Sequence, residues 1–561
     1  MSVKKTFVTS ISAICVAWII LYNSYRYGDK EAYISTIVQA RKCYDLGFIY
    51  RAIEMSTRAI ALSPHKTEPY FIKIRCFIQM LDFDEALNLL KKVEKLCTTK
   101  YEENVYDSLV ILYSEKEKLY NYYLQTFDNA KLIKPFLNSM YKNDVQILHN
   151  DIFYNAYGVR GICATRDLGV GDEIVAVPEN MIVSAVKSRK LLAQKYAKEE
   201  KKSPEDIKKI LMELYKKNTF ALGLYILEHQ NESRFKPFVD MINSNDYTSF
   251  PLRFDSKTLD LLRGTDLEKK YISLKEALDH DFSLLYKIDS IKKKYDINTL
   301  QNIYLAVSSR NFGWSFAGYH DMLIVPYIDM CNHSSNPNTR WYYDEQKNCF
   351  CLIATKTIQQ GCEIFDTYGA SKSNTQLLLA YGFCLDDNED NDEVILEYPL
   401  YRKNGSDTIF LGNKEYVCRK NTDTVKNNFS TFLNHIMEGI LNDNKNIPLI
   451  DAARKTMDIV NKLAKKKLDS YSGTLQEDKN ILISKSALLT FNERNCYLVR
   501  VSEKNVLKWI IDFTEYCTQL LSQCLSVDDL KMFFVNSEIN NEVKRFFTKS
   551  KFFSDLLKDI K

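Results

Sequence analysis

Side chains that could take part in chemistry gather between residues 324 and 386 of this 561-residue chain. One group consists of Asp329, Asn332 and His333, and the other begins at Tyr368 and Gly369. An Asn side chain both donates and accepts hydrogen bonds, which suits a zwitterionic ligand, and a Tyr hydroxyl can stabilise charge during a reaction. Such residues at the ends of short strands predict a site built on irregular backbone.

Short strands are the elements that must position these side chains. Aromatic and apolar residues at 341–343 and 349–354 flank a polar turn at 344–348, which predicts a β-hairpin. The following Gly-Cys-Glu turn at 361–363 leads into another short strand before Tyr368. Further upstream, residues 159–167 and 169–178 predict two strands separated by a glycine turn. Each of these strands and turns is common in proteins when taken alone, so the interpretation depends on their order along the chain.

Four blocks, at 159–178, 309–312, 329–334 and 368–383, together resemble the SET methyltransferase domain. The resemblance is greatest to the branch typified by the Rubisco large-subunit lysine methyltransferase and its actin-histidine and nuclear lysine relatives. The helical sequence between the first two blocks is similar to the long insert of that branch, and the region after 391 resembles its C-terminal domain. The resemblance implies an α+β protein, with a β-rich SET domain split by a helical insert and followed by an all-helical substrate-binding domain.

The same resemblance implies S-adenosyl-L-methionine as cofactor and a protein lysine as the methyl acceptor. Tyr368 matches the active-site tyrosine of the family, and Tyr381 is expected to line the channel for the target residue. Phe383 is expected to stack on adenine, and Arg310 to pair with the carboxylate of the cofactor. The remaining cofactor-binding residues implied by the resemblance are Arg160, Gly161, Ile162, Asp329, Asn332, His333 and Tyr368.

Two departures from the family pattern affect this interpretation. Gly158 stands in the strand where some relatives place a Glu that holds the cofactor amine. The turn after Tyr368 has the longer form, which favours lysine over histidine as the target, and histidine methylation stays open as an alternative. A second alternative is a SET-like scaffold without catalysis that binds partners through its helical repeats.

The N-terminal region contains an apolar segment and then a predicted repeat. Residues 7–22 carry no charge, which favours a retained membrane anchor within region 1–30, and a cleaved signal peptide or a buried helix are the other interpretations. With an anchor, we expect a transmembrane helix and a body facing the cytosol, the membrane being unspecified. Residues 31–140 resemble tetratricopeptide repeats, because Ile49, Ala52 and Ile53 recur 34 positions later as Phe83, Ala86 and Leu87. Such helical repeats usually bind a peptide or partner protein.

Composition excludes several other classes. The net charge of +4 gives no sign of the basic surface that nucleic-acid binding needs. The 14 cysteines form no C-x-x-C pair, so we expect neither a metal site nor a disulfide framework.

The predicted domains are 1–30, 31–140, a SET domain over 150–390 with its insert at about 185–305, and a helical substrate-binding domain over 391–561.

Overall fold

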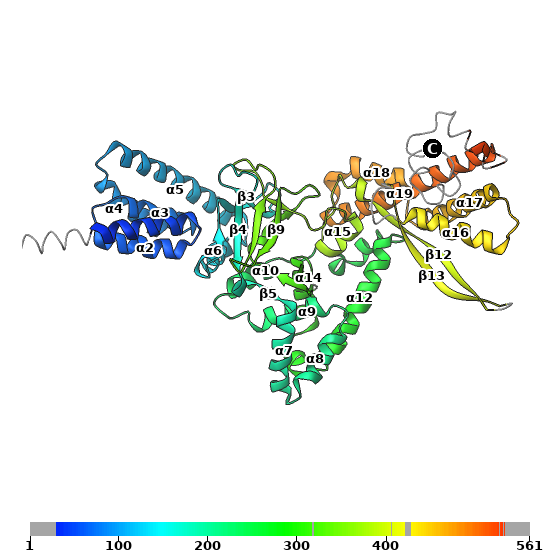
Figure 1. Cartoon of the computed structure of the whole chain (residues 1–561), viewed down its shortest axis with the longest axis horizontal. Helices are drawn as coiled ribbons and strands as arrows, with labels where there is room; N and C mark the ends of the chain where they lie inside the picture. The colour runs from blue at the N-terminus through cyan, green and yellow to red at the C-terminus, as the bar shows by residue number, and fades with distance from the viewer. Residues whose placement is uncertain are drawn as a thin grey trace, which may run out of the picture. The chain divides into compact units, whose positions relative to one another are not determined.

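The computed structural model describes residues 30–524 apart from 317–318, 405–406 and 421–427, and in addition residues 526, 528–530 and 532. The chain divides into two compact units, both drawn in Figure 1. Unit 1 contains residues 1–213, 217–246 and 288–368, and unit 2 contains residues 214–216, 247–287 and 369–561. Both units are therefore assembled from segments that are distant in sequence. The domain boundaries expected from the sequence stay a prediction.

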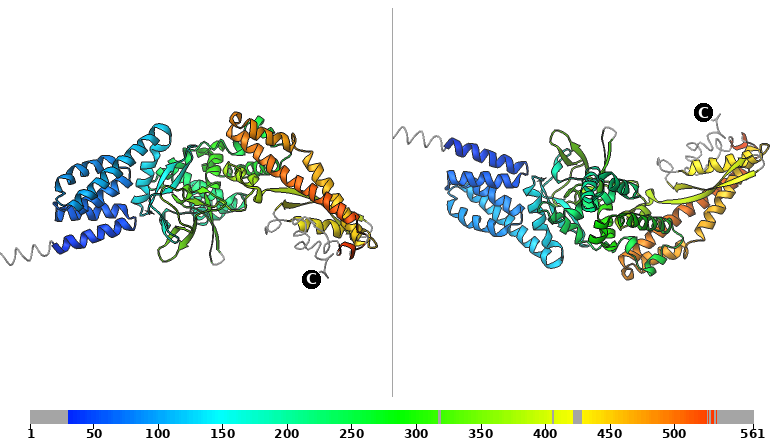
Figure 2. Two further views of the ribbon diagram at one scale, coloured as in Figure 1. Left: turned by 90° about the horizontal axis from the view of Figure 1, so that it is seen from above. Right: turned by 90° about the horizontal axis from the view of Figure 1, so that it is seen from below.

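Unit 1 begins with a stack of helices, which lie side by side in both Figure 1 and Figure 2. After a helix at residues 30–45 come α2 (Ile49–Leu62), α3 (Glu68–Gln79), α4 (Phe83–Val93) and α5 (Lys100–Thr126). Buried apolar residues of α3, α4 and α5, among them Tyr70, Ile74 and Leu90, form one core. The predicted helical region is thus present, while its assignment to tetratricopeptide repeats stays a prediction.

Short sheets follow in unit 1. The largest has the strand order β1-β4-β10-β9, in which β9 (Thr339–Asp344) and β10 (Cys349–Ala354) form the predicted hairpin. The packing of this hairpin accounts for its aromatic residues, because the ring of Trp341 stacks on buried Phe350 at a centroid distance of 5.1 Å. The other two strands are β1 (Gln146–Ile147) and β4 (Glu173–Pro178).

Three smaller sheets complete the strand-rich part of unit 1. They are β2–β3, the parallel pair β8–β11, and β5-β7-β6. Their bounds are β2 (Asn150–Tyr154), β3 (Arg160–Ala164), β5 (Val183–Ser184), β6 (Asn311–Phe316), β7 (Tyr319–Ile324), β8 (Asn332–His333) and β11 (Phe365–Asp366). The helices of the same unit are α6 (Ile133–Lys142), α7 (Ala185–Glu200), α8 (Pro204–Glu213), α9 (Lys217–Glu228), α10 (Lys236–Asn243), α13 (Asp289–Lys294) and α14 (Ile297–Ser308).

Unit 2 is mainly helical. It contains α11 (Ser256–Asp260), α12 (Asp266–Leu285), α15 (Asn374–Tyr381), α16 (Phe429–Asp443), α17 (Leu449–Leu468), α18 (Leu475–Ser484) and α19 (Phe491–Ser522), with one long antiparallel ribbon of β12 (Glu393–Asn404) and β13 (Asp407–Arg419). The 32-residue α19 begins with a Thr490–Glu493 capping box. It packs along α17, and residues of both helices contribute to the largest apolar core of this unit.

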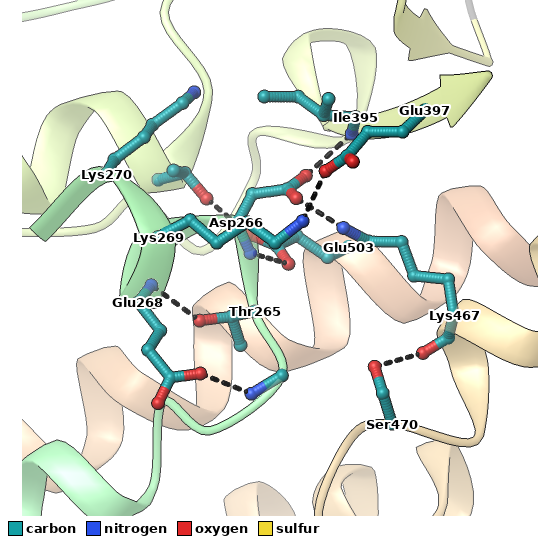
Figure 3. Close-up of polar contacts among 12 residues, drawn as sticks. Thr265, Asp266, Glu268, Lys269, Lys270, Ile395, Glu397, Lys467, Ser470 and Glu503 are labelled. Carbon is teal, nitrogen blue, oxygen red and sulfur yellow. Dashed lines mark hydrogen bonds and ion pairs between the residues drawn. The ribbon is translucent and has the colours of Figure 1, made fainter. Parts of the chain in front are cut away.

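A buried polar network crosses unit 2 (Figure 3). The carboxylate of Asp266, at the start of α12, forms an ion pair with Lys467 of α17 and accepts a hydrogen bond from the Ile395 backbone N–H at 2.6 Å. The backbone N–H of Asp266 donates to the carboxylate of Glu503 in α19 at 2.9 Å. Glu503 also accepts hydrogen bonds from the hydroxyl groups of Tyr471 and Thr375. The network therefore joins four helices and the ribbon through satisfied polar groups.

The architecture confirms the predicted α+β class, with strand-rich and helical regions in the expected order. The predicted membrane anchor requires correction. In the part of the chain that the structure describes, no helix combines the length and the apolar character that a bilayer crossing needs. Residues 7–22, on which that prediction rested, lie outside the described residues. The predictions of a membrane localisation and of a membrane partner are therefore wrong.

Candidate active site

Asn332 and His333 form the two-residue strand β8, which pairs in parallel with Phe365 and Asp366 of β11. The backbone N–H of Ser334 donates to the Asp366 carbonyl at 2.9 Å and continues this pairing. Parallel pairing of two short strands brings residues 329–334 beside residues 363–368. The structure thus joins two of the predicted blocks, as the interpretation of the sequence requires.

The side chain of Asn332 connects β8 to β3. Its Nδ2 donates to the backbone carbonyl of Arg160 at 3.1 Å and to Oε1 of Glu363 at 2.7 Å. Burial raises the pKa of Glu363 above its usual value, and the hydrogen bond from Asn332 acts in the opposite direction. Sequence reasoning missed Glu363, although its place in the Gly-Cys-Glu turn was a usable signal.

Gly161 lies at the point where these groups meet. A Cβ atom at this position would stand 2.6 Å from Glu363 Oε1, 2.7 Å from Asn332 Nδ2 and 3.0 Å from Phe153 Cε1. Any side chain would therefore displace the two polar groups, so the close approach requires glycine. The neighbouring Ile162 is fully buried, and its carbonyl accepts a hydrogen bond from the N–H of Ile364 at 2.8 Å.

Two arginines and one aspartate form a charged cluster in unit 1. Nη1 of Arg310 lies 3.5 Å from Oδ2 of Asp329, whose side chain is inaccessible to solvent. The guanidinium of Arg160 donates to the sulfur of Met241, and it interacts electrostatically with both Arg310 and Asp329. Burial raises the pKa of Asp329, while the two guanidinium groups lower it. Two cationic groups thus face one carboxylate, and an anionic ligand would complement this imbalance.

Tyr368 follows β11 and is hydrogen-bonded to Cys331, which immediately precedes β8, and to His333 in β8. Its hydroxyl donates to the Cys331 carbonyl at 2.9 Å, and its backbone N–H donates to Nδ1 of His333 at 3.1 Å. The two rings stack with centroids 5.2 Å apart. A backbone N–H can only donate, so Nδ1 is the unprotonated nitrogen and the neutral imidazole carries its proton on Nε2.

Tyr381 and Phe383 belong to unit 2, whereas the other predicted site residues belong to unit 1. Tyr381 is the last residue of α15, and Gly382 caps this helix with a φ of 79°. The two aromatic rings have centroids 6.4 Å apart in a tilted arrangement. The structure therefore brings together Arg160, Gly161, Arg310, Asp329, Asn332, His333 and Tyr368, with Ile162 adjacent, and it places Tyr381 and Phe383 in another compact unit.

Comparison with protein families identifies two regions of the chain. Residues 159–369 match the SET domain, and these residues include β3, β8, β11 and the Tyr368 position. Residues 425–507 match the family described as Rubisco LSMT substrate-binding, and they include α17, α18 and part of α19. The class defined by fold and site is thus a protein with a SET domain followed by a substrate-binding domain of the Rubisco LSMT type.

Individual relatives are distant. The actin-histidine N-methyltransferase of Papio anubis is 22% identical over 393 residues, which are 62% of this chain and 62% of the relative. The chloroplastic ribulose-1,5-bisphosphate carboxylase/oxygenase large subunit N-methyltransferase of Nicotiana tabacum is 19% identical over 393 residues, which are 63% of this chain and 75% of the relative. A solved structure of Rubisco LSMT bound to AdoMet has a TM-score of 0.56 at 17% identity and covers 76% of this chain and 99% of that chain. This last similarity establishes the fold.

Proposed function

We propose that this chain is an S-adenosyl-L-methionine-dependent protein methyltransferase that acts on a lysine amine of a non-histone protein. The observation that carries the proposal is the hydrogen bonding around β8 and β11, where Tyr368 bonds both His333 and Cys331, and Asn332 bonds the strand that contains Gly161. The match of residues 159–369 to the SET domain supports it. We assign Tyr368 and Tyr381 to the reaction and the target channel, and Phe383 to adenine.

The cluster of Arg160, Arg310 and Asp329 fits the amino-acid part of this cofactor. Its two guanidinium groups would hold the carboxylate of the cofactor, and charge-assisted hydrogen bonds between guanidinium and carboxylate groups are short and strong. Gly161 contributes indirectly, because the absence of a Cβ leaves room for the polar groups of Asn332 and Glu363 beside this strand. Gly158 offers no side chain for the cofactor amine, so we expect the carboxylate contacts to contribute most of the polar binding energy.

When bound, the cofactor would supply an electrophilic methyl group on a sulfonium. The chain itself must orient the amine and exclude water. The hydroxyl hydrogen of Tyr368 is donated to Cys331, so its oxygen acts as an acceptor toward an amine N–H. Stacking on His333 and the hydrogen bond to its Nδ1 fix the position of the Tyr368 backbone. Tyr368 is therefore the residue best placed to align the nucleophile.

Calorimetric titration of the full chain with S-adenosylmethionine tests the proposal. Wild-type protein should bind, and Gly161→Ala should bind at least about tenfold more weakly, a loss of about 1.4 kcal/mol, because the new Cβ displaces Asn332 and Glu363. Gly313→Ala is the matched control, since a Cβ on that strand residue meets nothing within 4 Å. Absence of binding by the wild type at millimolar cofactor would refute the proposal and favour a scaffold.

A histidine target is the second candidate, because the relatives include an actin-histidine N-methyltransferase. The two targets differ in the pH dependence of the rate. A lysine must lose its proton before attack, so the rate should rise with pH toward about 10.4, whereas a histidine is already neutral above about 6.5. Mass spectrometry of modified peptides identifies the residue, and a rate that is constant between pH 7 and 9 with histidine modified would overturn the lysine assignment.

We also propose that the N-terminal helices are tetratricopeptide-type repeats that bind a partner protein. α2 begins at Ile49 and α4 begins at Phe83, which is a spacing of 34 residues, and the corresponding Ala52 and Ala86 are both fully buried. Small residues at these positions let neighbouring helices pack closely. A pull-down with the full chain, compared with an Ala52→Leu variant that separates the helices, tests this assignment: loss of partner capture is expected, and unchanged capture contradicts it.

A further inference from the structure

Tyr327 lies immediately before the segment that carries the candidate cofactor residues, and its backbone has an unusual conformation. Its φ of 77° and ψ of −52° correspond to a γ-turn with positive φ, which residues with side chains rarely adopt. The turn is followed by the short helix Ile328–Met330, which contains Asp329, and then by Asn332 and His333 in β8. A conformation of this kind persists only where the surroundings enforce it.

The side chain of Tyr327 holds the γ-turn in this conformation. It is fully buried, and its hydroxyl donates a hydrogen bond of 2.7 Å to Oδ1 of Asn150 in β2. Asn150 is itself fixed, because its Nδ2 donates to the carbonyls of Leu148 and Ile174 at 3.0 and 2.9 Å. The Asn150 amide cannot turn over without breaking three hydrogen bonds, so it is a rigid acceptor.

The ring of Tyr327 is held by a second element. It lies parallel to the ring of Phe136 in α6, with centroids 6.1 Å apart and an interplanar angle of 3°. Phe136 is also fully buried and packs against Phe238 of α10. The hydroxyl and the ring of one residue thus connect the turn to β2 and α6 directly, and to α10 through Phe136.

We infer that Tyr327 is a positioning residue of the cofactor site, which holds the γ-turn that directs Asp329, Asn332 and His333. The identity of the ligand rests on the proposed function. Tyr327 is an additional residue of the site, which acts without touching cofactor or substrate. Because the strained turn lies two residues before Asp329, a change in its direction moves the carboxylate and the following strand together. Loss of the hydroxyl should therefore weaken cofactor binding without a direct contact being lost.

The test compares Tyr327→Phe with Tyr196→Phe in the full chain. Tyr196 is a matched control, because it is fully buried in the same unit and its hydroxyl donates to Glu228 at 2.8 Å. In cofactor-free protein, amide hydrogen exchange over residues 328–333 should be about tenfold faster in Tyr327→Phe and unchanged in Tyr196→Phe. The dissociation constant for S-adenosylhomocysteine should rise about fivefold to tenfold only in Tyr327→Phe.

The two readouts separate the possible failures. Unchanged exchange in residues 328–333 of Tyr327→Phe overturns the positioning role, whatever the wild type binds. A wild type that binds no S-adenosylhomocysteine overturns the proposed function, and the exchange result still decides the role of the turn. Tyr327→Gly is the second variant, because glycine tolerates the positive φ but has neither hydroxyl nor ring. It should bind more weakly than Tyr327→Phe, and wild-type affinity in this variant would contradict the inference.

Discussion

Replacing Lys467 by Met should destabilise unit 2 strongly, because it removes the cation that neutralises buried Asp266. The Lys467 side chain is 13% exposed and that of Asp266 is 3% exposed, so water cannot replace the lost partner. Glu503 lies next to Asp266 through the 2.9 Å hydrogen bond from the Asp266 backbone, and burial together with the Asp266 charge raises the pKa of Glu503. Removing the lysine therefore leaves the buried carboxyl groups of Asp266 and Glu503 next to each other without the positive charge of its ammonium group.

The expected magnitude follows from this burial. Breaking a buried ion pair by deleting one partner costs about 3–5 kcal/mol, which is a large part of the roughly 5–15 kcal/mol that stabilises a folded domain. Lys462→Met is the matched control in the same helix. Lys462 forms an exposed pair with Asp458, with side chains 73% and 56% accessible, and such pairs contribute at most about 0.5 kcal/mol. Met has a helix propensity similar to that of Lys, so the substitution itself has little effect on α17.

Hydrogen exchange resolved by peptide is the appropriate assay, because a chain of two compact units need not unfold in one step. The free energy of opening for amides of α12 and α17 should fall by about 3–5 kcal/mol in Lys467→Met, and by less than about 1 kcal/mol in Lys462→Met. Adding Asp266→Asn to Lys467→Met should recover about half of the loss, since the uncompensated charge disappears and the amide oxygen still accepts from Ile395. Equal effects of the two lysine substitutions would refute the reasoning.

Three further predictions concern the candidate site. Tyr368→Phe should lower kcat by about 100-fold or more while cofactor affinity stays nearly intact, and steady-state kinetics that show full turnover would remove Tyr368 from the reaction. Arg310→Met should raise the cofactor dissociation constant about 10-fold to 150-fold, as expected for loss of about 1.5–3 kcal/mol from a charged hydrogen bond, and calorimetry that shows equal affinity would contradict this role. Burial raises the pKa of Asp366 to about 6 from an ordinary 3.8, so the unfolding free energy of unit 1 should fall by up to about 3 kcal/mol as pH rises from about 4 to 6. Asp366→Asn should abolish that fall, and an identical pH profile of the variant in denaturant titrations would show that another group is responsible.

The sequence was sufficient to predict the elements whose signals are local. The hairpin around residues 344–348 follows from its aromatic and apolar flanks, and β9 and β10 form it. The resemblance to the SET domain implies that Asn332 and Tyr368 lie in one site, and the parallel pairing of β8 with β11 brings their segments together. Both predictions depend on patterns that extend over several residues.

Other features depend on side chains that meet only in the folded chain. Glu363 looks like an ordinary turn residue, and its bond to Asn332 requires the pairing of β8 and β11. A tyrosine carries no sequence signal for positive φ, so the turn at Tyr327 could not be predicted. In α19, Glu503 and Lys504 suggest an exposed helix face, yet both are buried, because Asp266 of α12 and Asp478 of α18 are their polar partners.

The hydrogen bond from Asp266 to Glu503 spans 237 positions of the chain, and this separation has a consequence for biosynthesis. At about 5–20 residues per second, the ribosome needs roughly 12–47 s to synthesise α19 after the start of α12 has been made. During this interval α12 waits for its partners in the nascent chain. The groups of Asp266 that lack their partners during this interval are its carboxylate and its backbone N–H, and water can solvate both until Lys467 and Glu503 have been made.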